Sequence, residues 1–271
     1  MSSPSSGKEV IHSNIWYEEP EPDSPFSAVT CRCRGYDVYG ELIKRASFIE
    51  YLFLLFAGER PSSPQTRLLE TLAIALANPG PRDASVHAAM SAGVGGSPAA
   101  SALMAALGVG AGNLGGGHEV RVAMEAWERL GCDLPGWETF LEHPTLPERA
   151  DIWSPIEHAP GFDPHGLRCA TPVRQTLDVL AACGAGYHLP WLATHRLTLE
   201  NAAGAPLAMS GVAAATCRDL GLNAKQGEML YLLLRLPGAA AHALEQEQLG
   251  FKRFPFFHGA VKYAEPRADN D

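Results

Sequence analysis

Apolar residues recur at spacings of three and four along most of the 271-residue chain, and this periodicity constrains the fold more than any other feature. Between residues 41 and 57 it gathers on one helical face Leu42, Ile43, Ala46, Ile49, Leu52, Phe53 and Phe56. The alternation that a half-buried strand needs is almost absent. The sequence therefore predicts an all-α protein.

Glycine and proline divide this periodic pattern into segments. The predicted helices cover residues 41–57, a segment from 63 or 64 to 77, stretches within 84–109, and then 118–130, 136–142, 173–183, 189–201, 207–220, 224–234 and 237–249. The segment 84–109 is dominated by Ala, Ser, Gly and Met, which predicts closely packed helices. Residues 1 to about 30 carry Pro20, Pro22 and Pro25 among acids, which predicts an extended arm or tail.

Charge and hydropathy exclude several classes of protein. The net charge is −9, from 21 basic and 30 acidic residues, and no basic stripe appears, so a nucleic-acid partner is not expected. The longest apolar run, Tyr51 to Ala57, is too short to cross a bilayer, so no membrane span is expected. Charged residues make up only 19%, below the usual quarter, which suggests that an oligomer hides part of the surface.

The six cysteines and the polar start bear on location and metal binding. No CxxC pair occurs, and Cys31-x-Cys33 is too tight for an ordinary zinc knuckle, so no metal site is expected. Residues 1–8 are polar and Ser-rich and do not resemble a signal peptide. We therefore expect reduced thiols in a cytoplasmic protein.

Three blocks near the N-terminus resemble, in order and spacing, the signature of citrate synthases and citryl-CoA lyases. They are Arg34-Gly35-Tyr36-Asp37, then Ala46-Ser47-Phe48-Ile49-Glu50, then Leu54 to Pro61. Later blocks at 114–119, 160–165, 206–211 and 235–246 resemble the family patterns GGANE, PGFGH, PLNVDG and ARVPG followed by AHALEQ. With Lys252-Arg253 and the Tyr263 tail, the resemblance covers roughly Val29 to Pro266. The length fits the lyase type, including the domain that ends ATP-citrate lyase.

The resemblance implies a citrate synthase-like all-α fold, with a large and a smaller helical domain. It divides the chain into an N-terminal arm (1–28), a large domain formed by 29–135 and 206–271, and a small domain (136–205). It also implies a homodimer or higher homo-oligomer. Coenzyme A would enter as a thioester substrate, and no permanently bound cofactor is expected.

Family chemistry runs through an acyl-CoA enol, and the resemblance implies which residues serve it. A carboxylate takes the α-proton, and histidines polarise carbonyl groups. His165 lies in the PGFGH-like loop, which has gained Pro164, and it would polarise a substrate carbonyl or hydroxyl. The alternative is a surface histidine without a role. His118 follows Gly116 and Gly117 at a predicted helix start, where the backbone can approach an anionic ligand.

Arginines hold the substrate carboxylates in this family, because the guanidinium fork matches a carboxylate. Arg174, Arg235 and Arg253 match them, and Arg253 would come from the neighbouring subunit. Arg235 also follows the apolar run 230–234, where a charge needs a partner or must reach solvent. Arg168 would meet a phosphate of coenzyme A, although a lone loop arginine is usually just solvated.

Two positions depart from the family pattern. Ser210 stands where the catalytic aspartate is expected, and serine is no carboxylate base. Pro79 stands where the second histidine is expected. His87, eight residues further on, would substitute for it, unless it only packs in its helix. His242 and Glu245, three residues apart, favour a structural role.

These features leave several functions open. The first is a citryl-CoA lyase-like carbon–carbon lyase that releases acetyl-CoA and a keto acid, or forms the bond in reverse. The second is a catalytically impaired relative that binds CoA esters or polycarboxylates, which the replacements at Pro79 and Ser210 favour. A citrate synthase-type acyltransferase and a helical scaffold without CoA chemistry are further alternatives.

Overall fold

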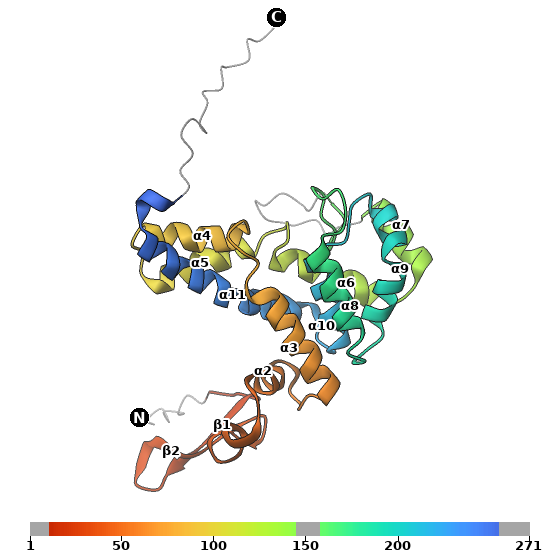
Figure 1. The fold of residues 1–271 in the computed structure, drawn as a ribbon. Helices are drawn as coiled ribbons and strands as arrows, with labels where there is room; N and C mark the ends of the chain where they lie inside the picture. Colours follow the sequence, from red (N-terminus) through yellow and green to blue (C-terminus); the bar gives the residue numbers. More distant parts are fainter. Residues whose placement is uncertain (1–10, 145–157, 255–271) are drawn as a thin grey trace, which may run out of the picture. The chain divides into compact units, whose positions relative to one another are not determined.

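The computed structural model describes residues 11–144 and 158–254, and these parts are mostly helical, as the sequence predicts (Figure 1). The helical elements are η1 (Val38–Leu42), α1 (Ile43–Arg45), α2 (Phe48–Ala57), α3 (Ser63–Ala77), α4 (Ala84–Val94), α5 (Ala99–Gly110), α6 (Gly117–Leu130), α7 (Leu134–Glu142), α8 (Thr171–Ala181), α9 (His188–Ala203), α10 (Met209–Asp219), α11 (Ala224–Leu249) and η2 (Phe251–Arg253). Tyr263 of the expected closing motif lies outside the described residues. No helix in the described ranges is long and apolar enough to cross a membrane.

A small antiparallel sheet replaces part of the extended arm or tail that the sequence predicts for residues 1 to about 30. β1 (Trp16–Glu21) pairs with β2 (Ser24–Cys33), and β2 pairs with β3 (Tyr36–Asp37). Most residues of β1 and β2 are exposed, so neither face imposes the alternation that would reveal a strand in the sequence. Arg34 and Gly35 join β2 to β3, and both have positive φ angles, which suits a tight hairpin turn.

The helix predicted over 41–57 is interrupted before Phe48. Ser47 is the N-cap of α2, and its hydroxyl accepts a hydrogen bond from the Glu50 amide at 3.2 Å. The Glu50 carboxylate accepts one from the Ser47 amide at 2.7 Å, which completes a capping box. Because these side chains satisfy amides that would otherwise lack partners, a new helix begins here.

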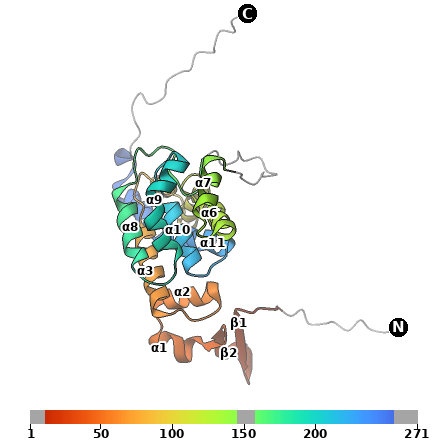
Figure 2. The same ribbon diagram turned by 90° about the vertical axis from the view of Figure 1, so that its right-hand side faces the viewer.

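The chain divides into two compact units, each with its own core. Unit 1 contains the chain up to Leu76 and Ala111–Leu234, and unit 2 contains Ala77–Gly110 and the chain from Arg235 onward. Figure 2 shows the gathering of α6, α8, α9 and α10, whose buried side chains form much of the core of unit 1. The small domain expected over 136–205 lies within unit 1 and stays a prediction.

Small residues allow close helix packing in unit 2, as the composition of 84–109 predicts. The core of this unit is formed by Val86, Ala89, Met90, Ala102, Ala106, Ala239 and Ala243. A Cβ atom on Gly93 of α4 would collide with the carbonyl oxygen of Ala243 in α11. The two backbones therefore lie as close as glycine permits.

The two helices predicted over 224–234 and 237–249 are a single helix, α11, with Pro237 in its interior. Proline lacks the amide that would bond to the carbonyl four residues earlier, which is why the sequence predicts a break. Ala239 and Ala243, buried against α4 and α5, hold the following turns in unit 2. Arg235 thus lies inside a helix, whereas the sequence places it at a helix end.

Candidate active site

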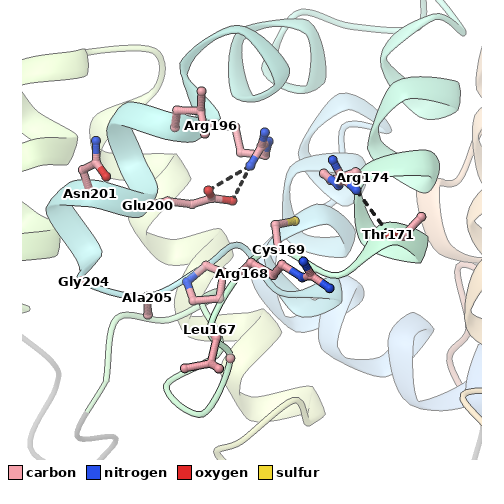
Figure 3. Close-up of a pocket in the computed structure, with 13 residues that line it drawn as sticks. Leu167, Arg168, Cys169, Thr171, Arg174, Arg196, Glu200, Asn201, Gly204 and Ala205 are labelled. Carbon is pink, nitrogen blue, oxygen red and sulfur yellow. Dashed lines mark hydrogen bonds and ion pairs between the residues drawn. The ribbon is translucent and has the colours of Figure 1, made fainter.

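A cavity of about 700 Å³ in unit 1 is lined by α8, α9 and the loop before α8 (Figure 3). Arg168 and Arg174, both predicted as binding residues, line it together with Arg196 of α9. A second cavity of about 430 Å³ is lined by Arg174 and Arg196 as well. The structure therefore brings two of the predicted arginines to one wall and adds a third from a different helix.

The charges around this cavity favour an anionic ligand. Arg196 bonds to both carboxylate oxygens of Glu200 at 2.8 Å, so this pair is nearly neutral. Arg174 donates to the hydroxyl of Thr171 at 3.2 Å and is otherwise exposed (Figure 3). Arg168 is also exposed. Three guanidinium groups against one carboxylate leave a net positive wall, which suits carboxylates or phosphates.

Cys169 lies in the wall of the same cavity but is a poor nucleophile. Burial raises the pKa of its thiol, and the negative charge of Glu200 raises it further. The side chain is buried, and only the thiolate form attacks electrophiles efficiently. Catalysis through this cysteine is therefore not expected.

A smaller cavity of about 210 Å³ shares Arg168 and Pro206 with the arginine-lined cavity. Its lining is largely apolar and includes Leu114, Phe162, Val173, Leu207 and Met209. Two carboxylates, Glu119 and Asp163, belong to the same wall. Neither of them is predicted as a functional residue from the sequence.

Glu119 is the centre of a buried hydrogen-bond cluster that includes Ser210. Its side chain is almost fully buried, and Oε1 accepts the Ser210 hydroxyl at 2.9 Å and the Gly161 amide at 2.8 Å. Oε2 accepts the Gly115 amide. Nε2 of His158 lies 3.7 Å from Oε1 and makes no hydrogen bond to any residue that the structure describes. Ser210, at the expected position of the aspartate, therefore has its proton directed to another carboxylate.

Close backbone approach builds this part of the site. The Ala208 amide donates to the Gly161 carbonyl at 2.9 Å, and the Asp163 amide donates to the Pro206 carbonyl at 2.8 Å. Gly161 has a φ of 90°, and a Cβ atom there would lie 2.8 Å from Cα of Gly211. Glycine is needed at position 161 both for its conformation and for space.

The remaining predicted residues of unit 1 are His165, Gly116 and His118, and none of them is among the residues that line these cavities. His165 is exposed in the loop before α8, and its amide donates to Oδ1 of Asp163 at 2.9 Å. Gly116 is the N-cap residue of α6, and His118 is the second residue of that helix and half-buried. Gly116 and His118 thus adjoin Gly115, whose amide donates to Glu119, whereas His165 lies on a separate loop.

The other predicted residues belong to unit 2. Arg235 is buried and forms an ion pair with Asp83, the N-cap residue of α4. His87 is exposed on α4, its ring 5.4 Å from that of Phe254, and Arg253 is exposed in η2. His242 contacts Glu245 at 3.2 Å and Asn78, beside Pro79, at 3.1 Å. Roles of these residues in substrate binding stay predictions.

Within residues 11–144 and 158–254, no group of three His, Cys, Asp or Glu side chains is arranged to hold a metal ion. The charged features of the described site are thus its arginines and carboxylates. These groups can bind anions and transfer protons.

No protein-family model matches the chain, and a search by sequence among curated proteins finds no match. Solved structures do match in fold. Citryl-CoA lyase from Hydrogenobacter thermophilus is 18% identical with a TM-score of 0.69, and the match covers 95% of this chain and 98% of that one. Citrate synthase from Thermoplasma acidophilum, in a ternary complex with carboxymethyl coenzyme A and oxaloacetate, is 16% identical with a TM-score of 0.54 over 82% of this chain and 60% of that one.

ATP citrate lyase from Methanothrix soehngenii, in complex with citrate and coenzyme A, also matches, with 17% identity and a TM-score of 0.71. The match covers 98% of this chain but only 43% of that larger one. An Asp→Ala mutant of ATP citrate lyase from Methanosaeta concilii, in complex with (3S)-citryl-CoA, gives the same coverage at 16% identity. The chain therefore shares its helical fold with these citryl-CoA lyase, ATP citrate lyase and citrate synthase structures.

Proposed function

We propose that the protein is a citryl-CoA lyase-like carbon–carbon lyase that acts on a 3-hydroxyacyl thioester of coenzyme A bearing carboxylates. The observation that carries the proposal is the arginine-lined cavity joined, through Arg168, to a small apolar cavity with carboxylates in its wall. The larger cavity suits the anionic parts of the substrate, and the smaller one suits its acyl end. The shared fold supports the choice of reaction.

In this reaction the bond between the α-carbon and the hydroxyl-bearing carbon breaks. The hydroxyl loses its proton and becomes a carbonyl, and the bonding electron pair passes to the thioester enolate. The α-carbon then takes up a proton, which yields acetyl-CoA and a keto acid. Arg168 and Arg174 would hold phosphate and carboxylate groups, and His165 would polarise the substrate oxygen.

The direct test is to incubate the purified protein with citryl-CoA and measure acetyl-CoA. A panel of other 3-hydroxyacyl-CoA thioesters covers a different substrate. Arg174→Gln is expected to raise KM roughly tenfold or more, because it removes a charge-assisted contact. Arg45→Gln, which removes an exposed arginine paired with Glu41 on the helix surface, is the matched control. Absence of turnover across the panel excludes a lyase.

The buried Ser210–Glu119 hydrogen bond favours a second candidate, a protein that binds CoA esters or polycarboxylates without converting them. A serine whose proton is directed to another carboxylate does not replace a catalytic aspartate. Calorimetry with CoA, citrate and citryl-CoA separates the two: heat of binding without product supports the binder. Mixing acetyl-CoA with oxaloacetate tests the third alternative, a citrate synthase-type acyltransferase.

Assembly and location also belong to the proposal. We expect a homodimer, in which Arg253 of one subunit contributes to the site of the other. Light scattering on the purified protein tests the dimer, and mixing Arg253→Gln and Arg174→Gln variants tests the shared site. The six cysteines are free, which supports a reducing compartment such as the cytoplasm.

A further inference from the structure

The small cavity has two carboxylates in its wall, yet the position expected to supply one, residue 210, is a serine. A carbon–carbon lyase of the proposed kind needs a group that exchanges a proton with the α-carbon of the thioester. Serine does not do this as a carboxylate would. The question is therefore which of Glu119 and Asp163 is available to a ligand.

Most of the hydrogen-bond acceptor positions of Glu119 are occupied by groups of the protein itself. Its side chain is 1% exposed, and its two oxygens accept hydrogen bonds from two backbone amides and the Ser210 hydroxyl. A carboxylate has about four acceptor positions, so most of its capacity is used. These bonds join the turn at Gly115, the loop at Gly161 and the start of α10. Glu119 thus holds the wall together and is poorly placed to meet a substrate.

Asp163 is available by the same criteria. It is half-buried, and Oδ1 accepts one hydrogen bond, from the amide of His165. Oδ2 accepts none from the described residues. A Cβ atom on residue 166 would lie 2.9 Å from Oδ2, so glycine at this position leaves room for the oxygen. The carboxylate is therefore oriented by one bond and has a second oxygen free for proton transfer.

A backbone hydrogen bond and an adjacent β-bridge hold the backbone of Asp163 in place. Its amide donates to the Pro206 carbonyl at 2.8 Å, and the adjacent Phe162 forms an antiparallel bridge with Leu207. Residues 206–208 lead directly into α10 and Ser210. The carboxylate absent at 210 is thus matched by one on the neighbouring segment, at a residue that lines the small cavity as Met209 does.

We propose that Asp163 is the catalytic carboxylate of this site, exchanging a proton with the α-carbon of the acyl thioester. The inference rests on the proposed lyase function and adds the residue that serves it. In the bond-forming direction Oδ2 takes a proton from the acetyl methyl group, and the C–H electron pair becomes the enolate double bond. In cleavage the protonated Asp163 gives its proton to the enolate released by carbon–carbon scission, while the proton of the substrate hydroxyl passes to solvent water, from which Asp163 is protonated again.

The size and lining of the cavity suit this step. About 210 Å³ is below the usual range of about 300–1,000 Å³ for whole ligands, so it fits an acyl end rather than a complete CoA ester. The apolar lining of Leu114, Phe162 and Met209 limits water around the carboxylate. Arg168, shared with the larger cavity, places a cation where the anionic remainder of the substrate would lie.

The test uses the full-length protein with acetyl-CoA in D₂O, where mass spectrometry follows deuterium entering the methyl group. Asp163→Asn retains an oxygen for the His165 amide but no longer accepts the proton. We expect exchange and citryl-CoA cleavage to fall at least about 100-fold, with KM and affinity for CoA nearly unchanged. Asp163→Glu should restore part of the rate. Asp23→Asn, at an exposed position in the β1–β2 turn, is the matched control.

Each outcome decides the matter. Cleavage by the wild type that persists in Asp163→Asn overturns the role of Asp163 and leaves the lyase standing. Absence of cleavage in the wild type overturns the lyase and this inference with it. A loss of rate that follows only a loss of thermal stability, and that Asp163→Glu does not relieve, shows a structural role and overturns the inference. Glu119→Gln, in contrast, should lower stability because it breaks the buried cluster.

Discussion

At the scale of single residues, the pair between Arg235 and Asp83 shows how one carboxylate can serve two purposes. Asp83 caps α4 through the amides of Ser85 and Val86, and it also neutralises part of the charge of buried Arg235. Removing one partner of a buried ion pair destabilises the charge that stays behind. The predicted substrate-binding role of Arg235 therefore has to coexist with this structural one.

Asp83→Ala should lower the free energy of unfolding by about 3 kcal/mol, because it removes both the charge partner and the helix cap. Asp83→Asn retains an oxygen for the cap and should lose less. Urea unfolding followed by circular dichroism measures both values, with Asp23→Asn as the control. Equal stability of Asp83→Ala and wild type would show that the ion pair contributes nothing.

Ser210→Asp would place a second carboxylate against Oε1 of Glu119, which now accepts the Ser210 hydroxyl at 2.9 Å. Two carboxylates at such a distance do not both ionise readily, so the folded variant should retain a proton that the unfolded chain releases. Its stability should therefore fall as pH rises from 4 to 7, relative to wild type. Thermal melts across that range measure this, with Ser210→Asn, which adds bulk without charge, as the control. A parallel pH dependence in the two proteins would contradict the prediction.

At this scale, some of the residues that line the candidate cavities are predictable from the sequence. Arg168 and Arg174 were predicted and share one cavity, whereas Arg196, Glu119 and Asp163 were not singled out. Glu119 gains its meaning from Gly161 and Ser210, which are 42 and 91 residues away in the chain. Arg196 lies four residues before Glu200, which in sequence resembles an ordinary exposed helix pair. Such contacts depend on tertiary packing and leave no local signal.

At the scale of elements, two helical glycines show that a small residue does not always mark close helix packing. Gly93 and Gly108 both lie near the ends of helices in unit 2. A Cβ atom at Gly93 would meet the carbonyl oxygen of Ala243, and one at Gly108 would meet nothing within 4 Å. The same substitution should therefore have opposite effects at the two positions.

Gly93→Ala should destabilise the protein by about 1–3 kcal/mol, because backbone must move to admit the methyl group. Gly108→Ala should stabilise it by about 0.5–1 kcal/mol, because alanine loses less conformational entropy in a helix. Urea midpoints of the two variants against wild type give the comparison. If both substitutions stabilise the protein, the backbones of α4 and α11 do not approach each other as closely as described.

Most of the longer helices were predictable because they bury an apolar stripe, and their ends follow local rules. The termination of α3 before Asn78-Pro79 is one example. The break at Ser47 also had a local signal, since Ser47 and Glu50 form the pattern of a capping box. The strands β1 and β2 had none, because an exposed hairpin with Pro20 at an irregular pairing needs no hydrophobic alternation. The continuity of α11 through Pro237 depends on tertiary packing.

At the scale of the whole molecule, the fold was predictable from ordered motif blocks, whereas the two compact units do not follow those blocks. The motif patterns occur in both units, because a motif is a stretch of sequence whereas a unit is defined by which residues contact one another in space. The boundaries at Leu76, Gly110 and Leu234 reflect how the helices pack, and two of them lie at or near the ends of α3 and α5. The third lies within α11, three residues before Pro237.

Buried thiols link the core to the pH dependence of the whole molecule. Burial raises the pKa of Cys217 to about 12 from an ordinary value of 9.0, and burial also raises the pKa of Cys132 and Cys169. The pKa of Tyr51 is raised by burial and by the nearby Cys33. The folded protein thus retains protons that the unfolded chain releases in alkaline solution.

A group whose pKa is raised by folding contributes its full stability below the unfolded pKa and loses it as pH rises. The ionisation of Cys217 should therefore change the urea midpoint little between pH 7 and 8 and lower it above about pH 9. Each such group adds a slope of up to about 1.4 kcal/mol per pH unit in that window. Cys217→Ala isolates one of them, since it should be less stable at pH 7 yet lose stability less steeply between pH 9 and 11. If stability falls equally steeply with pH in Cys217→Ala and wild type, the prediction is wrong. Burial of Cys217 would then not oppose the loss of its proton.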